Sequence, residues 1–94
     1  MFVVKLTYTN PIEKIDELRP VHLKFLDIYY EKNIFIASGR QAPAVGGIIL
    51  ARGVSKKELE NILQQDPFCI EKVATYEITE FSVNKFNSAL KDLL

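Results

Sequence analysis

His22 is the only histidine in the chain, and no other side chain here titrates near neutral pH when it is unperturbed. An imidazole acts as a general base, or donates a hydrogen bond to a substrate oxygen, when a carboxylate fixes its tautomer through the other ring nitrogen. We expect that carboxylate to be Asp66, which precedes Pro67 and is therefore held in extended backbone. The two side chains predict a His-Asp pair for proton transfer. The alternatives are a packing histidine and an aspartate that caps a turn.

Four further residues have side chains or backbone suited to binding a substrate. Arg19 and Arg40 carry paired N–H donors that match a carboxylate or a phosphate. Ser38 offers a hydroxyl group, and Gly39 lets a ligand approach the backbone closely. The alternatives are two solvated arginines and a plain turn at the end of a strand. These four residues are our candidates for substrate binding.

Motifs for metals and cofactors are missing from the sequence. One histidine and the distant Cys69 cannot build a zinc site, and the pair Gly46-Gly47 lacks the spacing of a phosphate-binding loop. A lone cysteine in an apolar stretch is typically a small buried hydrophobe, so we do not expect Cys69 to be a nucleophile. We expect no metal and no cofactor, and this favours isomerisation or elimination over redox chemistry.

Length and composition predict one domain spanning residues 1–94, because 94 residues with 48% hydrophobic and 26% charged content can bury a single core. The 12 basic and 12 acidic side chains balance, so no net field attracts nucleic acid or an acidic membrane. A single cysteine and an N-terminal segment without the pattern of a secretory signal predict a cytoplasmic setting. No apolar run is long enough to cross a bilayer.

The first strand and helix follow from hydrophobic periodicity. Residues 2–9 alternate as in a half-buried strand, and a short helical turn is expected at 12–18. Proline is best tolerated at the first position of a helix, so Pro20 predicts a main helix over 20–32. His22 then lies in the first turn, where the positive end of the helix dipole and burial favour the neutral imidazole. Its apolar helix face is completed by Phe25, Leu26 and Tyr29.

The remaining elements are predicted by turn and capping signals. They are strands at 34–40 and 47–52 that form an antiparallel hairpin, a helix that ends at Asp66-Pro67, a strand at 73–83 and a short helix at 85–93. Ser55 and Glu58 have the spacing of a capping box and mark the start of the second main helix. A change of phase in the last strand indicates a bulge near Thr79 or Glu80.

The order strand, helix, strand, strand, helix, strand predicts an α+β fold: a ferredoxin-like βαββαβ antiparallel sheet with the helices on one face. The strands at 34–40 and 47–52 are apolar in both phases. A monomer seldom exposes so large an apolar patch, so we expect a homodimer joined through the open sheet face.

Several local motifs together resemble the YciI-like (YCII-related) family. They are Arg19-Pro20-Val21-His22-Leu23, Ser38-Gly39, and Asp66-Pro67-Phe68 followed by Tyr76-Glu77-Ile78. The resemblance covers nearly the whole chain and implies a dimeric α+β barrel similar in fold to muconolactone isomerase. It also implies an active site around His22 and Asp66, with Arg19 and Ser38 near the same pocket. Members of the family resemble lyases or dehalogenases of cyclic compounds.

Our leading hypothesis is a small-molecule enzyme, of lyase, isomerase or dehalogenase type, that transfers a proton on a cyclic or carboxylated compound. In it His22 moves the proton and Asp66 orients the imidazole. The alternative is a non-catalytic module that binds a metabolite or serves only as a dimerisation surface. RNA binding on the open sheet would need exposed aromatic residues and a basic surface, and the balanced charge argues against it.

Overall fold

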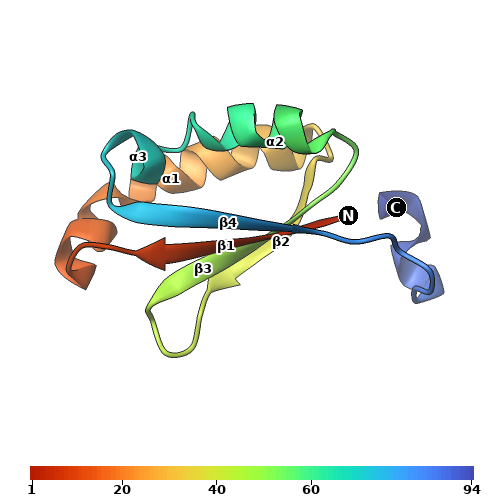
Figure 1. Cartoon of the computed structure of the whole chain (residues 1–94), viewed down its shortest axis with the longest axis horizontal. Coiled ribbons are helices and arrows are strands. Elements are labelled where there is room, and N and C mark those ends of the chain that lie inside the picture. The colour runs from red at the N-terminus through yellow and green to blue at the C-terminus, as the bar shows by residue number, and fades with distance from the viewer.

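The computed structural model describes residues 1–94. Its elements are β1 (Phe2–Tyr8), α1 (Ile12–Glu31), β2 (Phe35–Arg40), β3 (Gly46–Ala51), α2 (Lys56–Leu63), α3 (Pro67–Ile70), β4 (Ala74–Glu80) and the 3-10 helix η1 (Ser88–Leu93). The strands form one antiparallel sheet in the order β2-β3-β1-β4, and α1, α2 and α3 cover one of its faces (Figure 1). The predicted α+β, ferredoxin-like sheet with helices on one face is confirmed. None of the helices is both long and apolar enough to cross a membrane.

The central strand β1 shows the period of two that its sequence predicts. Phe2, Val4 and Leu6 are buried against the helices, whereas Lys5 and Thr7 are exposed on the opposite face. Between this face of the sheet and the helices lies the core cluster of 16 buried hydrophobic residues. The site described below is set into one end of that core.

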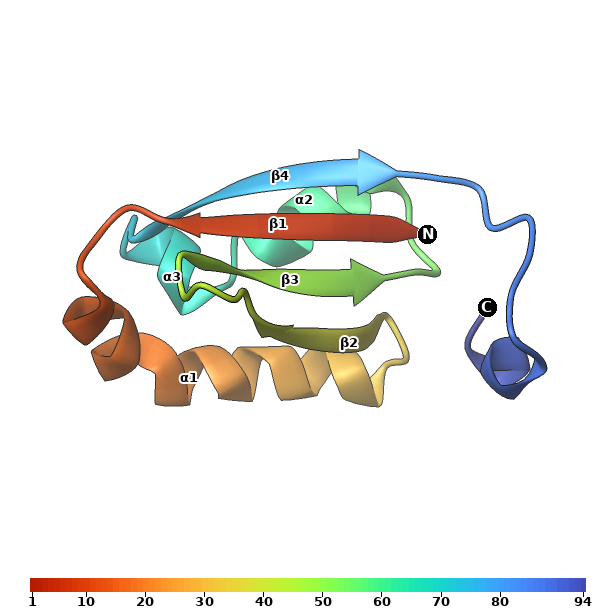
Figure 2. The same cartoon turned by 90° about the horizontal axis from the view of Figure 1, so that it is seen from below.

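The helix that carries His22 is longer than the sequence predicts. α1 runs continuously from residue 12 to residue 31 with Pro20 inside it, so the predicted start at residue 20 is wrong. Proline removes only one helical hydrogen bond, and Pro20 is exposed, so the helix bends near its start instead of ending (Figures 1 and 2). His22 consequently lies near the middle of α1, too far from the N-terminus for the helix dipole to act on it. The predicted apolar face is confirmed, because Phe25, Leu26 and Tyr29 are buried together with His22.

A bulge in β2 decides which side chains of that strand face the helices. The register between β2 and β3 shifts between Phe35 and Ala37, and beyond the shift Ser38 pairs with the buried Ile49. Directly paired residues point to the same face of a sheet, so Ser38 and Arg40 face the helices. Strict alternation from Phe35 would have turned both to the open face.

The C-terminal third departs from the prediction in three details. β4 pairs with β1 in unbroken register and ends at Glu80, so the predicted bulge near Thr79 or Glu80 and the extension to residue 83 are wrong. The predicted helix at 85–93 is a shorter 3-10 helix, η1. The segment that contains it extends beyond the end of the sheet (Figure 2).

The second main helix begins as predicted and ends differently. The Ser55 side chain accepts a hydrogen bond from the Glu58 amide and the Glu58 side chain returns one to Ser55, so the capping box is confirmed. α2 ends at Leu63, and Asp66 is not its last residue. Asp66 is instead the N-cap of the short helix α3, with Pro67 at the first helical position, where its missing amide proton has no cost.

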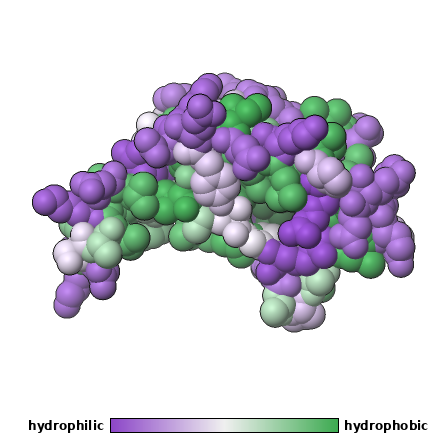
Figure 3. Space-filling view, turned by 180° about the vertical axis from the view of Figure 1, so that it is seen from behind, coloured by the Kyte–Doolittle hydropathy of each residue, from purple (hydrophilic) through white to green (hydrophobic).

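The open face of the sheet is divided into an apolar and a polar half. Ile48 and Leu50 of β3 are partly exposed, whereas Lys5, Thr75 and Glu77 on β1 and β4 are exposed polar residues. The molecule is hollowed on the side opposite the helices, and hydrophobic residues lie along this hollow (Figure 3).

Candidate active site

The centre of the site is a contact between α1 and α3. His22 Nδ1 lies 2.7 Å from Asp66 Oδ1, although the two residues are 44 positions apart in sequence. Asp66 is fully buried and His22 is 8% exposed. The structure therefore brings together the two residues that the sequence pairs for proton transfer.

Asp66 accepts three hydrogen bonds, and together they fix the state of the imidazole. Besides His22, Oδ1 accepts the Phe68 amide proton at 3.0 Å, and Oδ2 accepts the Tyr76 hydroxyl proton at 2.6 Å. The Phe68 amide and the Tyr76 hydroxyl donate to this carboxylate, so both of its oxygens already act as acceptors. An ionised carboxylate only accepts, so the proton of a neutral His22 sits on Nδ1 and leaves Nε2 free to accept another.

Tyr76 is held as a protonated donor in this arrangement. Burial raises the pKa of Tyr76 far above its usual value, and the negative charge of Asp66 and the hydrogen bond to it act in the same direction. The phenol therefore donates to Asp66 throughout the neutral and moderately alkaline range.

Aromatic packing fixes the plane of the imidazole. The Phe68 ring stacks on His22 with the centroids 4.0 Å apart and an angle of 8° between the planes. Phe25 lies on the same helix face as His22, with its centroid 6.5 Å from that of the imidazole. The hydrogen bond and the stacking together leave the ring little freedom to turn.

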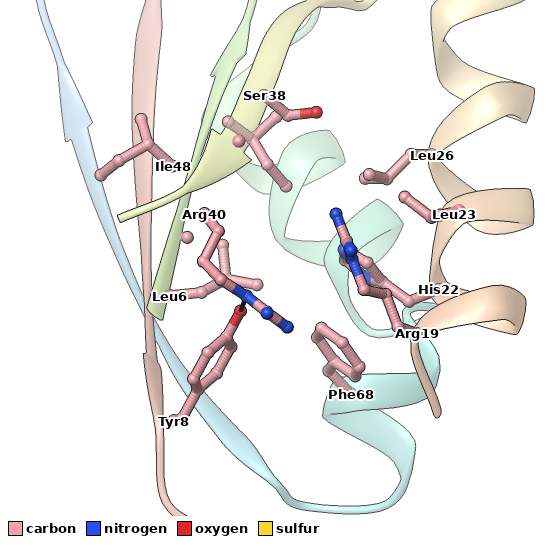
Figure 4. A pocket seen from close by; sticks show the side chains of 13 residues that line it. Leu6, Tyr8, Arg19, His22, Leu23, Leu26, Ser38, Arg40, Ile48 and Phe68 are labelled. Atoms are coloured by element: carbon pink, nitrogen blue, oxygen red, sulfur yellow. Dashed lines mark hydrogen bonds between the residues drawn. The ribbon is translucent and has the colours of Figure 1, made fainter. Parts of the chain in front are cut away.

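His22 lines a pocket of about 100 Å³ between α1 and the strands β1, β2 and β3. Asp66 and Tyr76 are not part of its wall, so Nε2 is the imidazole nitrogen on the pocket side. Figure 4 shows Arg19, Arg40 and Ser38 lying around the same space as His22. Leu6, Leu26 and Phe68 are among the apolar walls.

All four residues predicted to bind substrate line this pocket, but they differ in whether they already form hydrogen bonds or ion pairs within the chain. Arg40 donates to Asp16 at 2.6 Å and to the Tyr8 hydroxyl at 3.3 Å, and these two hydrogen bonds raise the pKa of Arg40 further. Arg19 is exposed and forms no ion pair. Arg19 is therefore the cation that is free to meet a ligand.

Ser38 and Gly39 occupy the β2 wall of the pocket. The Ser38 hydroxyl lies 2.5 Å from the Tyr30 hydroxyl, so one of the two can donate to its neighbour while the other donates to a ligand. A methyl group added at Gly39 would meet no atom within 4 Å, so packing within the chain does not require glycine there.

Sequence reasoning missed the part that Tyr76 and Phe68 play in the site. Tyr76 lies on the core-facing side of β4, opposite Leu6 of β1. A tyrosine on such a face needs an acceptor for its hydroxyl, and a buried aspartate is one; this is the signal that could have linked Tyr76 to Asp66. Cys69 is partly buried, and burial and the charge of Asp66 raise the pKa of its thiol, which favours the unreactive protonated form. No three His, Cys, Asp or Glu side chains are grouped to hold a metal ion.

The fold and site together define a ferredoxin-like α+β domain with a buried His-Asp pair beside a small pocket. The chain belongs to the YCII-related domain family, whose model matches residues 1–82. The resemblance inferred from the sequence motifs is thereby confirmed.

Among solved structures, the chain is similar to 5-chloro-2-hydroxyhydroquinone dehydrochlorinase (TftG) from Burkholderia phenoliruptrix AC1100, in complex with 2,5-dihydroxybenzoquinone. The TM-score is 0.71 and the sequence identity 14%, over 87% of this chain and 94% of the other. At this identity the likeness shows a common fold. No curated protein has a matching sequence.

Proposed function

We propose that the chain is a cofactor-independent small-molecule enzyme of lyase, isomerase or dehalogenase type. In this proposal His22 moves a proton on a cyclic or carboxylated compound. The observation that carries it is the 2.7 Å contact between His22 and Asp66, which leaves Nε2 on the pocket side of the ring. A protein of the same fold that is a dehydrochlorinase of a hydroxylated ring supports this class of reaction.

The chemistry follows from the free nitrogen and the charge behind it. His22 Nε2 takes a proton from a carbon next to a carbonyl or hydroxyl-bearing carbon, and the C–H electron pair forms a double bond. In an elimination, the leaving group departs from the adjacent carbon with its own bonding pair. In an isomerisation, the imidazolium returns the proton at another carbon. Asp66 stabilises the imidazolium in both cases and stays ionised.

The pocket limits the size and the charge of the substrate. A cavity of about 150 Å³ admits a benzene ring. A partly open pocket of about 100 Å³ therefore suits one small ring whose edge reaches the surface. Arg19 has no internal partner, so it favours a carboxylate or a phenolate on that ring, with Ser38 placed to bond a second oxygen.

We further propose that two copies of the chain pair through the open sheet face. Ile48 and Leu50 form part of a shallow groove on β2 and β3 that no element of the chain covers. A second copy related by a twofold axis would bury this apolar half in a closed assembly.

The function is tested by a ligand screen on two proteins. Small carboxylates, phenols and hydroquinones are screened by thermal shift, and each ligand that raises Tm is assayed for turnover by NMR. The control is His22→Gln, whose amide can still donate to Asp66 but cannot accept a proton. We expect ligands that bind both proteins and react only with the wild type. Ligands that bind equally and never react would support the non-catalytic binding module instead.

A further inference from the structure

We propose that Tyr76 is a positioning residue of the site, which holds the Asp66 carboxylate and, through it, the tautomer of His22. The part of this proposal that concerns turnover rests on the function proposed above. The part that concerns the tautomer of His22 stands on the structure alone.

Tyr76 is the only hydrogen-bond donor to one of the two oxygens of the Asp66 carboxylate. Asp66 Oδ1 accepts from the His22 ring and from the Phe68 amide, whereas Oδ2 accepts from the Tyr76 hydroxyl alone, at 2.6 Å. Asp66 is 0% exposed, so solvent does not reach its oxygens in the folded chain. Every buried side-chain polar atom of the chain has a hydrogen-bond partner, and for Asp66 Oδ2 that partner is Tyr76.

Tyr76 lies outside the pocket beside His22, so its contribution to catalysis can be distinguished from a contribution to substrate binding. Tyr76 comes from β4, whereas the pocket beside His22 is lined by residues of the other three strands and of α1 and α3. A substrate in that pocket touches neither Tyr76 nor Asp66. Loss of the phenol hydroxyl should therefore lower kcat and leave KM nearly unchanged.

Removal of the hydroxyl changes which nitrogen of His22 carries the proton. Without the Tyr76 donor, the Asp66 carboxylate is held at Oδ1 alone and can turn away from His22 Nδ1. Nδ1 then loses its acceptor, and the single proton of the neutral imidazole moves to Nε2 in part of the population. In that tautomer His22 faces the pocket with a proton and no longer acts as a base.

The test compares Tyr76→Phe with the matched variant Tyr29→Phe. Tyr29 also donates a core hydroxyl at 2.6 Å, but to the Gln65 side chain and not to Asp66. The first readout is the ¹⁵N chemical shifts of the His22 ring at pH 8, which distinguish the two tautomers and need no substrate. The second is the pair of constants kcat and KM with a substrate found in the screen.

We expect the wild type and Tyr29→Phe to show a protonated Nδ1 and a bare Nε2. In Tyr76→Phe we expect a population with the proton on Nε2 and a kcat lower by about tenfold or more, with KM nearly unchanged. Unchanged ring shifts in a folded Tyr76→Phe protein would overturn the proposal. If the wild type turns over no ligand, the proposed function fails, while the ring shifts still decide the role of Tyr76.

If Tyr76→Phe does not fold, the wild-type chain with 3-fluorotyrosine at position 76 replaces it. The fluorinated phenol is a stronger donor, and it draws electron density from the carboxylate. The bond from His22 Nδ1 should weaken, and the Nδ1 proton resonance should move upfield. An unmoved resonance would contradict the proposal.

Discussion

His22 Nδ1 lies 2.7 Å from Asp66 Oδ1, and the same carboxylate is the N-cap of α3. One side chain therefore ends the loop before α3 and orients the candidate base in α1. The position of Asp66 that caps α3 is therefore also the one that contacts His22.

Asp66→Asn separates capping from catalysis. Asparagine caps helices about as well as aspartate, so we expect the variant to fold. Its neutral amide cannot hold the proton on Nδ1 or stabilise the imidazolium, so turnover should fall by about a thousandfold or more. Steady-state kinetics and thermal unfolding of the two proteins check this. A variant with nearly wild-type turnover would show that the charge of Asp66 is not needed.

Arg19→Ala tests the proposed anion site. Arg19 is exposed and unpaired, so its loss should change the free energy of unfolding by no more than about 0.5 kcal/mol. Binding of an anionic ring compound should weaken at least tenfold, and the salt dependence of binding should become shallower. Lys24→Ala is the control, because it removes a positive charge from an exposed position of α1 outside the pocket. Calorimetry measures the binding affinity of each variant. Equal losses of affinity in Arg19→Ala and Lys24→Ala would indicate a general effect of net charge.

The raised pKa of Tyr76 predicts how stability changes in alkali. The folded state holds this proton to a higher pH than the unfolded state, whose tyrosine titrates at its usual value of about 10. The stabilisation is fully present below that pH and is lost as pH rises above it, by up to about tenfold in the unfolding constant per pH unit. Urea unfolding between pH 9 and 11 should show this loss in the wild type and a smaller one in Tyr76→Phe. The same slope in both proteins would be evidence against a protonated, buried Tyr76.

Two glycines of the β2–β3 hairpin provide a matched test of packing. An added Cβ at Gly46 would lie 1.8 Å from the carbonyl oxygen of Leu6, whereas one at Gly39 would meet nothing within 4 Å. Gly46→Ala should therefore destabilise the fold by about 2 kcal/mol or more, because β1 and β3 must separate. Gly39→Ala should leave the midpoint of urea unfolding nearly unchanged. If Gly39→Ala nevertheless weakens ligand binding, a ligand approaches the backbone of β2.

The proposed dimer is tested on the open sheet face. Leu50→Glu places a charge in the apolar half of that face and should yield monomers in sedimentation equilibrium. Thr79→Glu adds the same charge at an exposed position of β4, in the polar half, and should leave the assembly unchanged. A wild-type protein that sediments as a monomer at high concentration would rule out this interface.

Local signals in the sequence account for much of the fold. The alternation of β1 and the capping box of Ser55 and Glu58 depend on neighbours within a few residues, and both are present as predicted. The helix start predicted at Pro20 is wrong because the packing of α1 outweighs the local preference of proline. Ile15, before the proline, is 0% exposed, so burial continues the helix through it.

The site depended more on tertiary contacts, and the sequence predicted only part of it. His22 and Asp66 could be paired from residue type and family motif, but their contact arises from the packing of α1 against α3. The β2 bulge that turns Ser38 and Arg40 toward the helices depends on pairing with β3, which leaves no mark in the local pattern. Tyr76 lies on a strand, and its partner Asp66 is the N-cap of a helix, so no sequence periodicity connects the two residues.

Neutron diffraction on the wild-type protein near pH 8 locates the protons of His22, Asp66 and Tyr76 and so shows whether His22 is placed to act as a base. We expect a proton on His22 Nδ1 directed at an ionised Asp66, a Tyr76 hydroxyl proton directed at the other carboxylate oxygen, and a bare Nε2 facing the pocket. A proton on Nε2, or an imidazole turned away from Asp66, would contradict it.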